Sequence, residues 1–209
     1  MIGNVLAVLL GYLIGAIPLG LIMAKALKGI DIRDYGSGKI GATNVLRTVG
    51  LKAAVVVFAF DLGKGVAAVL IARGIGDATY VEVLAAGAAF AGHNWSVFIR
   101  FTGGRGVNTG LGGLFAMAPL WAAGAVGAGI LVIVLTRYVS LGSLTGATFG
   151  LVALLVLAAT GHGPWEYAGY AVAVVTLIYF QHWGNMQRLA RGEERRLGQP
   201  AEVREPTKR

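Results

Sequence analysis

Apolar stretches long enough to cross a lipid bilayer constrain the fold of this chain more than any other feature. A transmembrane helix needs about 20 predominantly apolar residues. Such stretches occupy most of the 209 residues, of which 56% are hydrophobic and 13% charged, and the mean hydropathy is +0.70. Helices satisfy their backbone hydrogen bonds internally, as a bilayer requires. The sequence therefore predicts an all-α integral membrane protein, with residues 1–209 forming a single polytopic domain.

The positions of Lys and Arg predict seven transmembrane helices, with the N-terminus outside and the C-terminus in the cytoplasm. The run 109–135 contains Pro119 and allows one tilted helix or two short ones joined near that proline. Two short helices place all 18 Lys and Arg residues except Arg73 and Lys64 on one face, in agreement with the cytoplasmic excess of cations in membrane proteins. One long helix would destroy this asymmetry, so we expect two. The other five spans are approximately 2–24, 53–72, 81–99, 139–160 and 167–182.

Composition also excludes several classes of site. The chain has no cysteine, so a disulfide, a thiol nucleophile and a Cys-based metal site are ruled out. No two histidines have H-x-x-x-H spacing and no compact carboxylate cluster exists, so we expect neither metal nor cofactor. The net charge of +8 accompanies too much apolar sequence for a soluble nucleic-acid binder. We read it as membrane orientation and attraction for anionic lipids and phosphates, with the bilayer as partner and no obligate protein partner.

Small and charged residues inside the spans carry further expectations. The spacing of Gly11 and Gly15, and of Gly142 and Gly146, is typical of close helix–helix packing in membranes. Asp61 and Lys64 lie three residues apart in the second span, where they could form a functional intramembrane pair or a buried structural one. The basic tail from about residue 195 is predicted to be disordered.

Three polar segments interrupt the apolar sequence on the predicted cytoplasmic face, at residues 28–52, 92–110 and 181–194. The first two combine glycines with cations, which suits loops that wrap phosphate oxygens. The first matches G-x-G-x-x-G and nearly matches a P-loop, but it lacks the βαβ context of the former and the Gly-Lys-Ser/Thr ending of the latter. In the third, a continuing helix would bring His182 and Asn185 near one face. Each segment also has a non-functional interpretation: a flexible loop for the first, a turn with a snorkelling arginine for the second, and an amphipathic interfacial tail for the third.

Together these segments resemble the bacterial acyl-phosphate:glycerol-3-phosphate acyltransferase family (PlsY type). Residues 36–47, G-S-G-K-I-G-A-T-N-V-L-R, are similar to the family pattern G-S-G-N-x-G-A-T-N-x-x-R. The second segment resembles G-H-x-x-P-V-F-x-x-F-x-G-G-K-G-V-A-T, and residues 182–194 resemble H-x-x-N-x-x-R-L-x-x-G-x-E. Arg105 stands where the family usually has Lys, and Lys39, Ser96 and Asn108 replace the usual Asn, Pro and Ala. The likeness covers nearly the whole chain.

The resemblance implies an enzyme of the bacterial cytoplasmic (inner) membrane, with its active site on the cytoplasmic face. It would move a fatty acyl group from acyl phosphate to the 1-hydroxyl of sn-glycerol 3-phosphate, giving lysophosphatidic acid and phosphate for phospholipid synthesis. Neither coenzyme A nor acyl carrier protein would be the direct donor. The residues that it implicates in catalysis are Ser37, His182 and Asn185; those implicated in substrate and phosphate binding are Gly38, Gly41, Thr43, Asn44, Arg47, Gly103, Gly104, Arg105 and Gly106.

An acyl phosphate is already activated, so no covalent enzyme intermediate is needed. We expect Ser37, Arg47 and Arg105 to grip phosphate groups, while Thr43 and Asn44 hold the loop and the substrates. His182 and Asn185 would place the glycerol hydroxyl or polarise the acyl carbonyl, and the base would be His182 or a substrate phosphate oxygen. A transporter of an organic phosphate is the alternative class, but it would need matching polar residues on both faces, and the predicted outer loops are short.

Overall fold

The computed structural model of the protein describes residues 1–203, which form ten α-helices and two short 3-10 turns. No β-strand occurs among these residues, which confirms the all-helical prediction for them. Residues 204–209 lie outside the described part of the chain. Of the tail predicted to be disordered, residues 195–203 are described and make specific hydrogen bonds to other segments, while the prediction for the remainder falls on residues outside the described part. The elements are α1 (Ile2–Ala16), α2 (Leu19–Lys28), η1 (Ile32–Asp34), α3 (Ala42–Thr48), α4 (Leu51–Ile75), α5 (Thr79–Asn94), η2 (Val97–Ile99), α6 (Val107–Met117), α7 (Pro119–Thr136), α8 (Val139–Ala159), α9 (Trp165–Gln181) and α10 (Trp183–Ala190).

Four helical stretches are long and apolar enough to cross a membrane by length and composition. They are Ile2–Lys28, Leu51–Ile75, Pro119–Thr136 and Val139–Ala159. Helices α5, α6 and α9 have 16, 11 and 17 residues, less than the about 20 of a typical span. The integral membrane character of the chain therefore has a direct physical basis, while the count of seven spans stays a prediction.

Prolines divide two of the apolar runs. Pro18 separates α1 from α2, and Pro119 is the first residue of α7, separated from the end of α6 by Ala118 alone. A proline ring removes an N–H donor and clashes with the preceding helical turn, so a helix ends before it. The run 109–135 therefore contains two helices. The predicted span 81–99 is too long at its end, because α5 stops at Asn94; exposed apolar side chains such as Phe98 extend the hydropathy signal into the following loop.

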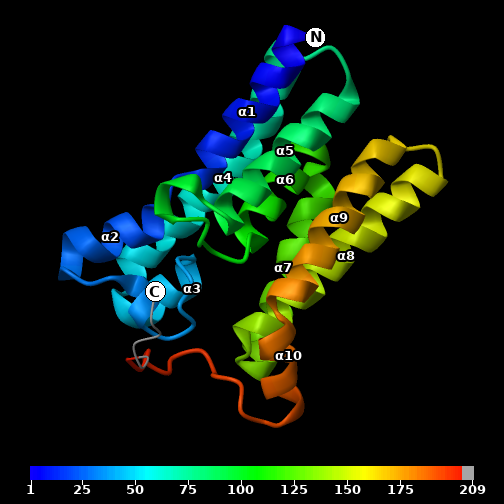
Figure 1. The fold of residues 1–209 in the computed structure, drawn as a ribbon. Coiled ribbons are helices and arrows are strands. Elements are labelled where there is room, and N and C mark those ends of the chain that lie inside the picture. Colours follow the sequence, from blue (N-terminus) through cyan, green and yellow to red (C-terminus); the bar gives the residue numbers. More distant parts are fainter. Residues whose placement is uncertain (204–209) are drawn as a thin grey trace.

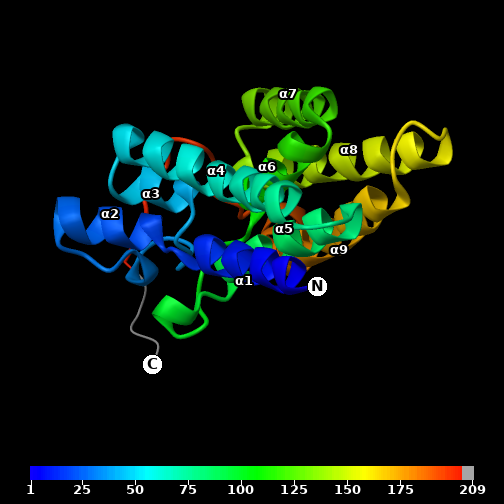
Figure 2. The same ribbon diagram turned by 90° about the horizontal axis from the view of Figure 1, so that it is seen from above.

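The helices form two adjoining groups (Figures 1 and 2). In one group α1 packs on α4 and α5, and α4 packs on α6; in the other α8 packs on both α7 and α9. Helix α5 also contacts α9 and α6 contacts α7, which joins the groups. Helices α2, α3 and α10 lie at the end of the molecule away from the N-terminus, and the C-terminal segment crosses that same end (Figure 1). The polar segments of the sequence are collected there.

Glycines set the distance between neighbouring helices. A Cβ atom on Gly15 of α1 would collide with the carbonyl oxygen of Ala89 on α5, and one on Gly92 of α5 would collide with Tyr12 of α1. On α8, a Cβ on Gly146 would lie 2.8 Å from the carbonyl oxygen of Ala125 on α7. Without a side chain, the backbones approach until dispersion contacts are made along the whole interface. The packing role predicted for the small-xxx-small glycines is confirmed.

Replacing Gly15 with Ala is therefore expected to destabilise the bundle. The added methyl group has no space between α1 and α5, and overpacking of this kind costs about 1–3 kcal/mol. The thermal unfolding temperature of the purified protein in detergent should fall. Gly87→Ala on α5 is the matched control, because nothing lies within 4 Å of a Cβ at that position. Equal unfolding temperatures for the two variants would contradict the assignment of Gly15 to the interface.

Candidate active site

The three polar segments meet around one cavity of ≈ 720 Å³ at the end of the bundle. Segment one supplies α3 and the loop before it, segment two the start of α6, and segment three the junction of α9 with α10. The convergence predicted from the sequence is thus present, although the binding role of each residue stays a prediction. The predicted site residues that line the cavity are Ser37, Gly41, Thr43, Asn44, Arg47, Arg105, Gly106, His182 and Asn185.

Asn44 organises the loop of segment one. Its Nδ2 donates to the carbonyl oxygens of Ile32, Tyr35 and Lys39 at 3.2, 3.0 and 2.8 Å. Its Oδ1 accepts from the backbone N–H of Ser37 at 3.3 Å. The residue is 3% exposed, so these bonds replace water for a buried amide. The sequence predicts that Asn44 holds the loop and binds the substrates, and the structure shows the first of these roles. By holding the loop, Asn44 positions Ser37 on the cavity wall.

The glycines of segment two allow the chain to pass closely beside α5. A Cβ on Gly104 would collide with the ring of His93, and one on Gly103 with the carbonyl oxygen of the same residue. The N–H of Gly104 donates to that oxygen at 2.9 Å, and Gly106 has a left-handed φ of 76° before α6 begins. Gly103 and Gly104 are absent from the cavity lining, so packing beside His93 is the role that the structure gives them, and Arg105, which follows them, reaches the cavity. Gly38 is also absent from the lining; it has a left-handed φ of 69° and its N–H donates to the carbonyl oxygen of Tyr35 at 2.9 Å.

Arg47 and Arg105 bring unpaired donors to the cavity. Within residues 1–203, the Nε atoms of both are buried and have no hydrogen-bond partner. Burial lowers the pKa of Arg105 to about 10, and burial also lowers the pKa of Arg47. Both guanidinium groups remain charged at neutral pH. Buried cationic donors of this kind bind carboxylate or phosphate oxygens strongly, so the cavity is suited to anionic ligands.

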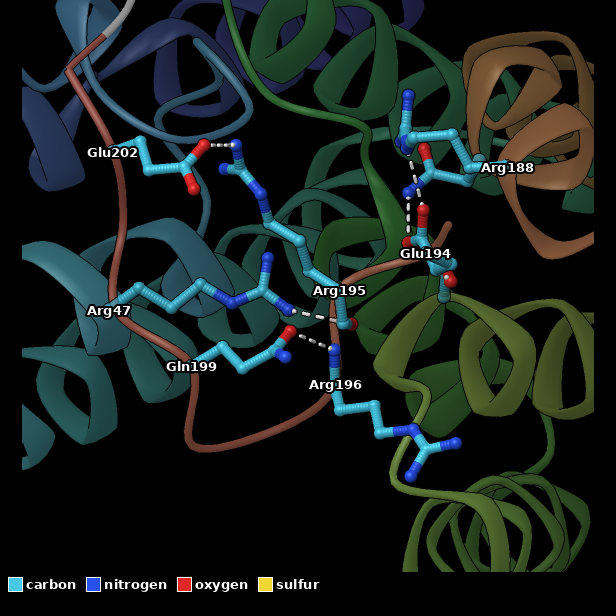
Figure 3. Close-up of polar contacts among 9 residues, drawn as sticks. Arg47, Arg188, Glu194, Arg195, Arg196, Gln199 and Glu202 are labelled. Atoms are coloured by element: carbon cyan, nitrogen blue, oxygen red, sulfur yellow. Dashed lines mark hydrogen bonds and ion pairs between the residues drawn. The ribbon is translucent and has the colours of Figure 1, made fainter. Parts of the chain in front are cut away.

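Glu194 is a cavity residue that the sequence did not single out. It is 8% exposed and accepts hydrogen bonds from Ser140 at 2.8 Å and from Asn185. It also accepts one from Arg188 at 2.8 Å (Figure 3). Burial alone would raise the pKa of Glu194, but these hydrogen bonds, from Asn185 first, lower it. The carboxylate therefore ties α8 to α10 and holds the amide of Asn185. The only hint in the sequence is its place as the last residue of the third motif.

His182 lies one residue beyond α9, where the helix breaks before α10 begins. The continuous helix considered from the sequence is therefore absent, but the next turn still carries Asn185 to the cavity. Nδ1 of His182 lies 2.8 Å from the carbonyl oxygen of Ile178. Because a carbonyl only accepts, Nδ1 carries the proton and Nε2 is the free acceptor. Burial, and then the charge of Arg105, lowers the pKa of His182 to about 4, so the ring is neutral at pH 7.

A buried ion pair lies beside the cavity. Lys64 Nζ donates to Asp61 at 2.8 Å and to the carbonyl oxygen of Ile17 at 2.6 Å. That oxygen lies just before Pro18, where the helix is broken. Asp61 Oδ1 is 3.5 Å from Nδ1 of His93, and both residues line the cavity. The pair predicted from the spacing of Asp61 and Lys64 is confirmed, and it joins α4 to the break between α1 and α2. A functional role for the pair, in addition to this structural one, stays a prediction.

An apolar cavity of ≈ 190 Å³ adjoins the polar one. It lies among α6, α7, α8 and α9 and is lined largely by aliphatic and glycine residues. Phe58, Val107, Ile133 and Ser143 line both cavities, so the two share walls. A ligand with an anionic head and a hydrocarbon tail matches this combination.

Comparison with known proteins agrees with this geometry. The family model described as glycerol-3-phosphate acyltransferase matches residues 5–192. A glycerol-3-phosphate acyltransferase of Thermus thermophilus is 46% identical over 98% of this chain and 100% of its own length; one from a Thermoanaerobacter species is 44% identical over 96% of this chain and 98% of its own. Crystal structures of PlsY (YgiH), an integral membrane glycerol 3-phosphate acyltransferase, in its glycerol 3-phosphate and lysophosphatidic acid forms have TM-scores of 0.87 and 0.84. Both are 37% identical to this chain, and each alignment covers 93% of this chain. The alignments cover 96% and 95% of the two solved chains, respectively.

Neutralising Glu194 is expected to destabilise the protein. Glu194→Gln removes the one carboxylate that Arg188, Asn185 and Ser140 share, and an unsatisfied buried polar group costs about 1–3 kcal/mol. Because the folded pKa is lowered, the stabilisation is present above the ordinary pKa of 4.5 and is lost as the pH falls through the folded pKa. The difference in unfolding temperature between wild type and variant should therefore shrink below about pH 4.5. Glu193→Gln removes an exposed neighbouring charge and serves as control; equal effects of the two substitutions would refute the assignment.

Proposed function

This chain belongs to the glycerol-3-phosphate acyltransferase family, and from that premise we propose that it transfers a fatty acyl group from acyl phosphate to the 1-hydroxyl of sn-glycerol 3-phosphate. The products are 1-acyl-glycerol 3-phosphate (lysophosphatidic acid) and inorganic phosphate. The observation that carries the proposal is the convergence of Arg47 and Arg105, with unpaired buried donors, on a polar cavity that adjoins an apolar one. A polar cavity supports binding of two phosphate groups, and an adjoining apolar one supports binding of an acyl chain.

The phosphate groups are held by Arg47, Arg105 and Ser37 in this proposal. Two anions approach one another only where cations offset their repulsion, and fixed guanidinium groups do this without reorganisation. Gly41 and Thr43, on the cavity wall at the start of α3, contact the substrates. The acyl tail lies in the apolar cavity among α6, α7, α8 and α9, with the reacting carbonyl near the shared wall at Ser143.

The reaction needs one nucleophilic attack and one proton transfer. The 1-hydroxyl oxygen attacks the acyl carbonyl carbon, the bond from that carbon to the phosphate oxygen breaks, and phosphate leaves with the bonding electrons. Nε2 of His182 accepts a hydrogen bond from the neighbouring 2-hydroxyl of the glycerol and so orients the 1-hydroxyl, whose own hydrogen stays available to the phosphate; Asn185 is fixed beside His182 by Glu194. A base works best with a pKa near the operating pH. Since the pKa of His182 is about 4, we assign the proton to a phosphate oxygen of glycerol 3-phosphate.

We further propose that the enzyme lies in the bacterial cytoplasmic membrane, with seven transmembrane helices and its active site on the cytoplasmic face. The seven spans are α1, α4, α5, α6, α7, α8 and α9, with the N-terminus outside. The short α5, α6 and α9 are supported as spans because each packs against part of a long apolar stretch: α5 against α1 of the stretch Ile2–Lys28, α6 against α4, and α9 against α8. The cytoplasmic excess of Lys and Arg supports the orientation.

The donor is tested directly with purified protein in detergent. Palmitoyl phosphate with glycerol 3-phosphate should yield lysophosphatidic acid and phosphate in equal amounts, detected by mass spectrometry and phosphate assay. Palmitoyl-CoA as sole donor is the control and should give no product. Transfer from palmitoyl-CoA at a comparable rate would overturn the donor assignment while leaving an acyltransferase.

Arg105→Ala is expected to lower kcat/KM for glycerol 3-phosphate by roughly 100-fold or more, as for removal of a preorganised donor at a developing anion. Arg105→Lys keeps the charge but loses the forked guanidinium, so it should retain an intermediate rate. Arg191→Ala is the control, since that exposed side chain lies outside the cavity lining. Initial rates of lysophosphatidic acid formation measure all three; wild-type kinetics for Arg105→Ala would exclude it from the site.

The pH dependence distinguishes the two candidate bases. We expect the rate to fall below about pH 6, the second pKa of a phosphate monoester. His182→Ala should lower the rate without moving this limb. A phosphonate analogue of glycerol 3-phosphate, whose second pKa is higher, should move the limb upward. A single limb near pH 4 that disappears in His182→Ala would instead make the imidazole the base.

A further inference from the structure

The segment after α10 passes from the cavity to the loop of segment one (Figures 1 and 3). Residues 195–203, here called the C-terminal strap, lie beyond residues 5–192, which the family model matches. Two of its members, Arg195 and Leu197, line the polar cavity. The strap therefore adds to the site a wall that the three motifs do not include.

One end of the strap contacts a proposed phosphate-binding residue. The carbonyl oxygen of Arg195 accepts a hydrogen bond from Nη2 of Arg47 at 3.2 Å (Figure 3). The guanidinium of Arg195 in turn lies 2.6 Å from a carboxylate oxygen of Glu202. These contacts hold one arm of the Arg47 fork while its Nε stays without a partner among the described residues.

The other end of the strap pairs with the backbone beside Ser37. The N–H of Gly36 donates to the carbonyl oxygen of Glu202 at 2.9 Å, and Tyr35 pairs with Val203 in an isolated antiparallel bridge. Gly36 has a left-handed φ of 56°, and a Cβ at this position would meet both Asn44 and Ala201. The turn that leads into Ser37 is thus held by segment one itself and by the strap.

The middle of the strap is anchored at the junction of α7 with α8. The N–H of Leu197 donates to the carbonyl oxygen of Arg137 at 2.7 Å, and Nη2 of Arg137 donates to the carbonyl oxygen of Leu197 at 2.8 Å. The strap consequently connects the second group of helices to segment one, on the opposite side of the cavity. The ion pair of Arg195 with Glu202 is itself largely exposed and contributes little; the backbone pairing carries the connection.

We propose that the C-terminal strap is a positioning element for glycerol 3-phosphate binding, with Glu202 and Leu197 as positioning residues that keep Ser37 and Arg47 in their binding conformations. Neither residue touches the reacting atoms. The proposal rests on the proposed function, because it names that substrate. Its consequence is specific: loss of the strap weakens binding of the polar substrate more than it slows the chemical step.

Truncation provides the first test. A chain ending at Glu194 should show a KM for glycerol 3-phosphate raised roughly tenfold, as for the loss of one or two hydrogen bonds at a charged site, with kcat changed less than about threefold. A chain ending at Val203 keeps the whole strap and should match the full-length protein. Affinity for glycerol 3-phosphate and for inorganic phosphate, measured by calorimetry, gives the same comparison without turnover. It therefore separates a failure of the strap from a failure of the proposed function.

A reversible cross-link provides the second test and does not depend on truncated chains folding. The hydrogen bond from Gly36 to Glu202 makes Tyr35 and Val203 a non-hydrogen-bonded antiparallel pair, whose Cα atoms lie at about 4.5 Å, within the range of a disulfide. The chain has no other cysteine to interfere. Leu197→Pro should raise the KM, because it removes the N–H that donates to the carbonyl oxygen of Arg137.

Adding Tyr35→Cys and Val203→Cys to that weakened variant should restore the KM towards the wild-type value when oxidised, and a reductant should raise it again. Tyr35→Cys alone should be insensitive to the reductant, and Glu193→Gln should leave the KM unchanged. The proposal is overturned if the chain ending at Glu194 binds glycerol 3-phosphate as tightly as the one ending at Val203. It is also overturned if the cross-linked variant has the same KM oxidised and reduced.

Discussion

The concentration of guanidinium groups around a small polar cavity is the constraint on which the rest of the structure depends. Burial lowers the pKa of both Arg47 and Arg105; the charges of Arg195 and Arg188 lower that of Arg47 further, and the charges of Arg188 and Arg47 lower that of Arg105 further. Glu194 offsets part of this repulsion and is held by three donors. Like charges stay together only where the surrounding fold is rigid or an anion joins them. The framework supplies the rigidity, and the remaining positive potential is what an anionic substrate would neutralise.

Rigidity comes from two devices suited to a membrane. Glycines bring helix backbones into contact, so α1 packs on α5 without intervening side chains. The buried charges of α4 are paired: Lys64 donates to both Asp61 and the carbonyl oxygen of Ile17 at the proline break. An unpaired charge there would cost far more than the pair does. The helices are thus held in fixed positions, and this restricts the conformations of the loops attached to their ends.

Much of the site could be predicted because its polar residues lie in three short, contiguous sequence motifs. Glycines beside cations between apolar runs identify the loops, and charge asymmetry places them on one face. The sequence motifs did not distinguish residues that bind a ligand from residues that fix the backbone around the cavity. Asn44 donates hydrogen bonds to backbone carbonyl groups of its own loop, and Gly103 and Gly104 lack a side chain where His93 packs against them. Glu194, Ser140 and the strap escaped notice because their significance depends on partners distant in sequence.

By itself, the sequence determined the all-helical membrane class, the proline break at Pro119, the pair of Asp61 with Lys64 and the family, because hydropathy, helical spacing and motifs are local properties of the chain. Tertiary structure alone decided which side chains share the cavity, where α5 ends, and that residues 195–203 return to the loop before Ser37. These features depend on the close approach of elements far apart in sequence. Such approach is set by the packing of whole helices, and no short stretch of residues encodes it.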